Sequence, residues 1–125
     1  MRTSPHKDRI IFKNYIKDDD RKFYYSLASV FIYPSFFEGF VFPPLEAMAC
    51  GTPVVASFNS SLPEVVGEGG VLVDPHGVVD ISMAVKNILT DSGLKEFLVK
   101  KGIEKAKGFT WDKCAQETLE VLNNA

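Results

Sequence analysis

Short apolar runs and longer stretches with helical spacing alternate along the chain. Runs of strand length predict strands at 9–14, 30–35, 52–58 and 70–75. Apolar residues that recur every three or four positions predict helices at 18–29, 42–51, 78–89, 94–107 and 110–122. Because the runs are almost unbroken, both faces of each strand are expected to be buried. The pattern therefore predicts an α/β fold, with a Rossmann-like parallel sheet that carries helices on both faces.

Local signals mark the ends of several helices. An aspartate is expected to cap the first helix, whose apolar face would hold Phe23, Tyr24, Leu27 and Ala28. Prolines open the 42–51 helix and Gly51 follows it, the usual asymmetry of helix ends. Ser61 and Glu64 have the spacing of a capping box, which would start a short helix that stops at Gly67. Thr110 is expected to cap the last helix.

Composition narrows the class of protein. The chain has 125 residues, 46% of them hydrophobic, which suits one globular domain or part of one. A net charge of −2 with scattered basic residues gives no basic face for nucleic acid. No apolar run is long enough to span a bilayer. Cys50 and Cys114 lack metal spacing and are expected to be reduced, buried thiols, while His6 and His76 are expected in surface loops.

The stretch after the 30–34 strand carries the candidate chemistry. In an open parallel sheet, ligands bind outside the carboxyl ends of the strands, and this strand ends at Ser35. Prolines at the start of the following helix have no N–H, so the free amides nearby belong to Gly39, Phe40, Val41, Phe42 and Leu45. Amides that converge on a helix N-terminus form an anion site, typically for phosphate. Gly39 could adopt a positive φ and admit a ligand close to the backbone.

Two glutamates flank these amides. Glu46 lies in the first helical turn, where phosphate would repel it unless it points past the phosphates towards neutral hydroxyls such as those of a ribose. Glu38 could accept hydrogen bonds from a second polyol, so the order of groups suits a nucleotide sugar. Alternatives stay open: Glu46 as a favourable first-turn acid, Glu38 as an exposed loop acid, or the pair as a glycosidase's carboxylates. Glycosidase chemistry needs no ring of free amides, so we rank that alternative below donor binding.

A family resemblance covers about residues 9–125. YPSFFEGFVFPPLEAMACGTPVVAS (33–57) resembles the signature of the retaining GT-B glycosyltransferases, and the likeness continues through SSLPEVVGEGGVLVDP (60–75) to FTWDKCAQETLEVL (109–122). The resemblance implies transfer of a sugar from a nucleoside diphosphate sugar with retention, without a bound metal or other cofactor. It places Glu46 on the donor ribose and Glu38, the candidate catalytic residue, near the transferred sugar. The amides of Gly39, Phe40, Val41 and Phe42 would meet sugar hydroxyls and phosphate.

The chain departs from the family in two ways. Val41 stands where the family commonly has glycine, and a β-branched residue disfavours positive φ. The chain also matches only the later part of the donor domain: residues 1–8 form a lead-in and 9–125 an incomplete domain. No Arg or Lys lies between Lys22 and Lys86 to neutralise a diphosphate. We therefore expect the chain alone to be catalytically inert, as a fragment or truncated gene product; the alternative is a non-catalytic binding module that keeps the fold.

The incomplete domain leads to expectations about partners. Strands 9–14 and 30–34 would lack the strand between them, so either they pair directly or the open edge supports a homodimer. The stripe from Trp111 to Leu122 is most often core, yet in the family the chain end leans on the missing acceptor-binding domain, so part of it could be exposed. We expect a cytoplasmic protein; peripheral association with the inner face of the membrane is common in the family.

Overall fold

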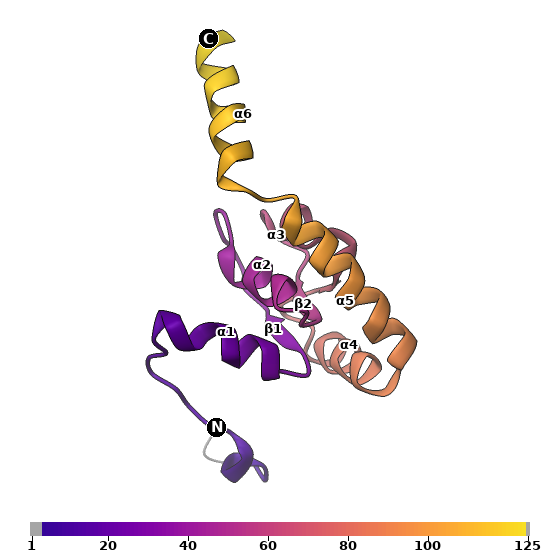
Figure 1. Ribbon diagram of the computed structural model, residues 1–125. Coiled ribbons are helices and arrows are strands. Elements are labelled where there is room, and N and C mark those ends of the chain that lie inside the picture. The colour runs from indigo at the N-terminus through magenta and orange to yellow at the C-terminus, as the bar shows by residue number, and fades with distance from the viewer. Residues whose placement is uncertain (1–3, 125) are drawn as a thin grey trace.

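The computed structural model describes residues 4–124, which form one sheet with helices on both faces (Figure 1). Its first elements are η1 (Lys7–Arg9), α1 (Asp18–Leu27), β1 (Phe31–Tyr33), α2 (Phe42–Ala49), β2 (Val54–Ser57), α3 (Leu62–Val66) and η2 (Gly67–Gly69). The remaining elements are β3 (Gly70–Val73), α4 (Val78–Thr90), α5 (Ser92–Lys107) and α6 (Trp111–Asn124). The α/β class predicted from the apolar pattern is confirmed.

Within residues 4–124 the sheet has three parallel strands in the order β1-β2-β3. Phe31 pairs with Val54, and Val54 pairs in turn with Gly70. Parallel neighbours need crossover connections, which α2 and α3 provide. All three carboxyl ends therefore lie at one edge of the sheet, where the turn after β1 also begins.

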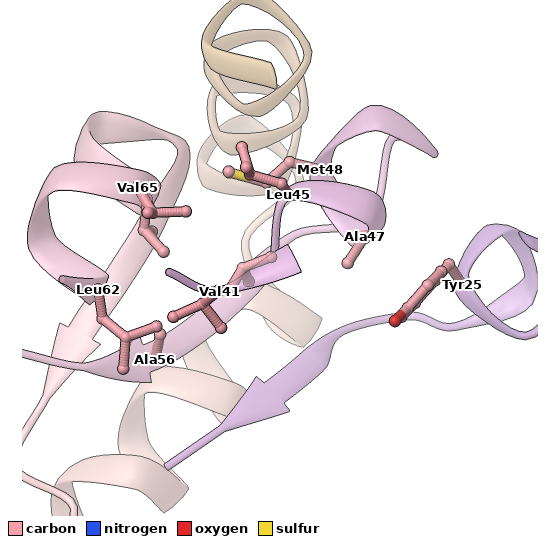
Figure 2. Packing of buried hydrophobic residues seen from close by; sticks show 10 residues of the cluster. Tyr25, Val41, Leu45, Ala47, Met48, Ala56, Leu62 and Val65 are labelled. Carbon is pink, nitrogen blue, oxygen red and sulfur yellow. The ribbon is translucent and has the colours of Figure 1, made fainter. Parts of the chain in front are cut away.

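The central strand divides the core into two layers. Val54 and Ala56 face a cluster built with α1, α2 and α3, whereas Val55 faces a second cluster with Ala84 and Ile88 of α4. Successive strand residues point to opposite faces, which explains the division. In Figure 2, Val41, Ala56 and Leu62 point towards one another. The unbroken apolar sequence of β2 follows from burial on both sides, as predicted.

The strand predicted at 9–14 is wrong. Lys7–Arg9 form η1, and no regular element covers 10–17. The expected direct pairing with 30–34 is also wrong, because among residues 4–124 the only strand that pairs with β1 is β2. A strand needs a neighbour for its backbone groups. Phe12 is consequently 69% exposed. Part of the lead-in expected at 1–8 lies outside the described residues.

The first helix begins and faces differently from the prediction. Lys17 is its N-cap, without a side-chain cap bond, and the aspartates occupy the first turn, where they favour the helix dipole. Tyr25 is its buried residue, whereas Phe23, Tyr24 and Leu27 are exposed. Helical spacing shows which residues of a helix are apolar, but not which face packs against the core. Helix α1 lies at the sheet edge (Figure 1) and packs through the face that holds Tyr25.

Three other helix ends have specific outcomes. Gly51 and Gly67 have φ of +77° and +52°, as expected for residues that end helices. Thr110 Oγ1 accepts a hydrogen bond from the Lys113 N–H at 3.2 Å, which confirms the predicted cap. The capping box at Ser61 and Glu64 is wrong, because Ser61 makes no cap bond and its hydroxyl is used elsewhere.

The last helix extends away from the rest of the molecule (Figure 1). None of its described residues is buried, and Trp111 is 76% exposed. The stripe from Trp111 to Leu122 is therefore not core within this chain. Cys114 lies on α6 and is exposed, while Cys50 at the end of α2 is partly buried, so the expectation of two buried thiols is wrong; both are free.

Across residues 4–124, no helix combines the length and apolar character needed to cross a membrane.

Candidate functional site

The turn between β1 and α2 is held by hydrogen bonds from side chains of the loop after β2. Ser60 Oγ and Ser61 Oγ donate to the carbonyls of Glu38 and Gly39, and Asn59 Nδ2 donates to the Phe36 carbonyl at 3.4 Å. Ser60 adopts a φ of +58° in this arrangement. These contacts occupy carbonyl oxygens of the turn and leave most of its N–H groups free.

Four of the five N–H groups that the sequence singled out are free. Among residues 4–124, the N–H groups of Gly39, Phe40, Val41 and Phe42 donate no hydrogen bond. The Glu38 N–H, by contrast, donates to Ser60 Oγ at 3.4 Å. Pro43 and Pro44 follow at the first positions of α2. Four unpaired donors at the start of an eight-residue helix are suited to an anion.

Backbone geometry at Gly39 and Val41 differs from expectation. The φ of Gly39 lies outside the left-handed region, and a Cβ added there would meet no described atom within 4 Å. The chain itself therefore gives no steric or conformational reason for glycine at this position. Val41 has an extended φ of −120°, which suits a β-branched residue, and its side chain is 2% exposed. It packs into the core while its N–H stays free.

Glu38 is oriented by two hydroxyls on one of its oxygens. Tyr33 Oη and Ser35 Oγ each donate to Oε1 at 2.8 Å. These bonds, that of Ser35 first, hold the pKa of Glu38 below its usual value. Burial and the same carboxylate raise the pKa of Tyr33. Since both donors reach Oε1, Oε2 keeps its acceptor positions for another partner.

Glu46 is held by a cation and a phenol. Arg21 Nη1 lies 3.3 Å from both of its oxygens, and Tyr25 Oη donates to Oε2 at 3.0 Å. Burial, followed by the bond to Glu46, raises the pKa of Tyr25 to about 12. Arg21 also pairs with Asp18, and its pKa is raised by that hydrogen bond and by the charge of Glu46. Glu46 remains partly exposed.

A hollow of about 940 Å³ adjoins the start of α2. Glu46, Phe40 and Phe42 line it together with Lys105 and Trp111, whereas Glu38, Gly39 and Val41 are not among its described lining residues. The Phe40 ring lies 5.1 Å from that of Phe42, which lies 6.2 Å from that of Trp111. The structure thus brings three of the six candidate residues to one hollow and places the other three in the adjoining turn.

Lys105 contributes a basic group that the sequence spacing did not indicate. It lies on α5, far along the chain from the turn, yet it lines the same hollow as Phe40. Its ammonium lies 5.4 Å from the centre of the Phe109 ring. Despite the gap in basic residues between Lys22 and Lys86, the hollow therefore has basic residues in its lining.

Sequence reasoning missed the residues that orient the two glutamates. Arg21 and Tyr25 come from α1, before the candidate stretch, and Tyr33 was assigned only to a strand. Asn59, Ser60 and Ser61 carried a signal, since they follow β2 and the carboxyl ends of parallel strands share one edge. For Arg21 and Tyr25 the apolar pattern gave no signal, because it predicted a different inward face of α1.

Comparisons with known proteins agree with the fold. A family model described as glycosyl transferases group 1 matches residues 4–105. O-antigen chain mannosyltransferase B of Escherichia coli is 44% identical over 112 residues, which are 90% of this chain and 29% of that protein. D-inositol 3-phosphate glycosyltransferase of Kribbella flavida is 44% identical over 104 residues, 82% of this chain and 24% of that protein.

A solved structure gives the same result. Sucrose-phosphate synthase from Thermosynechococcus elongatus superposes with a TM-score of 0.83 at 35% identity, covering 94% of this chain and 30% of that one. The chain thus spans 24% to 30% of the length of these three proteins. The resemblance to GT-B glycosyltransferases and the partial Rossmann-like fold are both confirmed. The chain belongs to the group 1 glycosyl transferase family.

Proposed function

We propose that this chain is the donor-binding portion of a hexosyltransferase that uses a nucleoside diphosphate sugar and retains the configuration of the anomeric carbon. The observation that carries the proposal is the set of four unpaired N–H groups at Gly39–Phe42, flanked by Glu38 and Glu46. Free amides at a helix N-terminus favour the negative charge of a diphosphate. Ionised carboxylates on either side accept hydrogen bonds from hydroxyls.

Each group has a distinct role in this proposal. The amides receive phosphate oxygens, Glu46 accepts from the ribose, and Glu38 accepts from a hydroxyl of the transferred sugar through its free Oε2. During transfer the bond between the anomeric carbon and the diphosphate oxygen breaks, and that oxygen keeps the electron pair. A new bond forms to the acceptor's hydroxyl oxygen, whose proton is released. The amides stabilise the leaving diphosphate as its charge grows.

The chain alone is expected to bind donor without transferring sugar. It spans 29% of the mannosyltransferase and 30% of the synthase, and we expect residues beyond this portion to present the acceptor. Two further partner expectations remain proposals. One is a homodimer through the open edge of β1, and the other is peripheral membrane association of a longer protein. Independence from metal also remains a prediction.

Calorimetric titration with uridine, guanosine and adenosine diphosphates tests the proposal. At least one should bind, and Glu46→Ala should weaken it by at least about tenfold, since a hydrogen bond to a charged group is lost. Glu96→Ala, on an exposed part of α5, is the matched control and should leave affinity unchanged. Absence of binding at millimolar concentration would contradict the proposal and favour a non-catalytic interaction module.

A further inference from the structure

Ser61, in the loop after β2, makes its hydrogen bond to the turn and not to its own helix. It is the N-cap residue of α3, yet its hydroxyl makes no cap bond and donates to the Gly39 carbonyl, 22 residues away. An N-cap serine ordinarily accepts a hydrogen bond from an N–H of the helix that it begins. The local structure of α3 therefore does not account for the direction of this side chain.

Ser60 has a backbone conformation that favours glycine. Its φ is +58°, and among residues 4–124 it is the only residue other than glycine with a positive φ. Its Oγ donates to the Glu38 carbonyl and accepts from the Glu38 N–H at 3.4 Å. One hydroxyl thus holds both peptide groups that flank Glu38. Residues in such conformations cluster at functional sites, and here the hydroxyl gives serine a use that glycine would lack.

The two serines fix the directions of two free amides. The peptide bonds that join Glu38, Gly39 and Phe40 are trans. In a trans peptide the C=O and the N–H lie in one plane and point in opposite directions. Because Ser60 and Ser61 bind the carbonyls of Glu38 and Gly39, the N–H groups of Gly39 and Phe40 point away from the loop.

The same hydrogen bonds favour anion binding by these two amides. A carbonyl that accepts a hydrogen bond polarises its peptide group, which makes the N–H of that group a stronger donor. A turn that is already held in one conformation also loses less conformational entropy when a ligand binds. Among the described residues, no side chain donates to the carbonyls of Phe40 or Val41, so the N–H groups of Val41 and Phe42 lack this support.

We infer that Ser60 and Ser61 are positioning residues, which aim the N–H groups of Gly39 and Phe40 at the diphosphate of the donor. The inference rests on the proposed function, because it concerns the same amides. In this role the serines act through two peptide groups and not by contact with the donor. Removal of either hydroxyl should therefore weaken diphosphate binding.

The probe is the diphosphate that binds, among those of uridine, guanosine and adenosine. Ser61→Ala and Ser60→Gly each remove one hydroxyl, and the backbone at Ser60 suits glycine. Each variant should bind about three- to tenfold more weakly, the range expected for one hydrogen bond. Ser61→Thr keeps a hydroxyl and should bind within about twofold of the unaltered chain. Ser26→Ala, whose hydroxyl donates to the Lys22 carbonyl at 2.8 Å on an exposed part of α1, is the control and should leave affinity unchanged.

NMR distinguishes positioning from a general loss of structure. In the ligand-free chain, Ser60→Gly should shift the carbonyl carbon-13 signal of Glu38, because that carbonyl loses a hydrogen bond. Ser61→Ala should shift the carbonyl signal of Gly39 for the same reason. The carbonyl signals of β2 should stay in place in both variants.

Unaltered affinity in both Ser60→Gly and Ser61→Ala would overturn the inference and leave the proposed function intact. Equal weakening in Ser61→Thr and Ser61→Ala would also overturn it, because the hydroxyl would then not be the cause. Absence of binding by all three diphosphates overturns the proposed function itself, and the inference with it.

Discussion

At the scale of single residues, the two motif glutamates differ in what their neighbours leave available. Glu38 receives both of its hydroxyl donors on one oxygen, whereas Glu46 receives donors on both. The sequence predicted the two carboxylates and the amides between them from the strand-end rule and the double proline. It could not predict the orienting side chains of Arg21 and Tyr25, because they depend on which face of α1 packs against α2.

Ser35→Ala is predicted to raise the pKa of Glu38 towards the ordinary value, because it removes the main hydrogen bond to the ionised form. In the unaltered chain that bond stabilises the fold above the ordinary carboxyl pKa and is lost as pH falls through the lowered one. Carbon-13 NMR titration of the Glu38 carboxyl measures the shift. Ser61→Ala, whose hydroxyl meets the Gly39 carbonyl instead, is the control. An unchanged Glu38 titration in Ser35→Ala would contradict the assignment.

Gly39→Ala separates ligand binding from folding. A Cβ there meets no described atom within 4 Å and the φ is not left-handed, so the free energy of unfolding should change by less than about 1 kcal/mol. If a diphosphate sugar approaches this backbone, the added methyl should weaken its binding by about tenfold or more. Urea denaturation and calorimetry give the two numbers. Unaltered binding would show that the ligand does not come close to Gly39.

At the scale of elements, the apolar period located β1, β2, β3, α2, α4 and α5. It failed at 9–14, because an apolar run shows that a segment is suited to burial but not whether a neighbouring strand is present. It also failed on the face of α1, where the exposed Phe23 and Leu27 are as apolar as a core residue. The capping box failed because Ser61 is drawn to the turn at Gly39, a contact distant in sequence.

The packing of α5 on η2 depends on two glycines. A Cβ on Gly69 would lie 2.7 Å from Gly102 Cα and 2.8 Å from Met48 Sδ. Gly69→Ala should therefore force α5 away and lower the free energy of unfolding by about 1–3 kcal/mol. Urea denaturation of Gly69→Ala and Gly39→Ala compares their free energies of unfolding. Equal stability of the two variants would show that α5 can move away from η2 without loss of stability, which would contradict the prediction.

At the scale of the whole molecule, apolar surface is exposed at both ends of the described chain. Phe12 and Tyr15 lie exposed before α1, and Trp111 and Leu122 lie exposed along α6. The buried clusters lie between them, on the two faces of the sheet. The sequence indicated that one face of α6 is apolar. Apolar character alone could not show whether the residues that would bury this face belong to this portion of the protein.

We predict that α6 opens without the rest of the fold. With no buried residue among those described, its amides should exchange with solvent far faster than those of β2, all of whose residues are buried. Hydrogen exchange followed by NMR at low protein concentration distinguishes the two. Protection of α6 equal to that of β2 would mean that another surface covers the helix, and protection that rises with concentration would identify a second copy.

The most direct measurement is a nitrogen-15 NMR titration of the chain with the nucleoside diphosphate that binds. The account predicts saturable shifts of the Gly39, Phe40, Val41 and Phe42 amide signals, larger than those of Val78 and its neighbours at the start of α4. Saturable binding that leaves the four signals in place would contradict it, because the diphosphate would then lie elsewhere on the molecule.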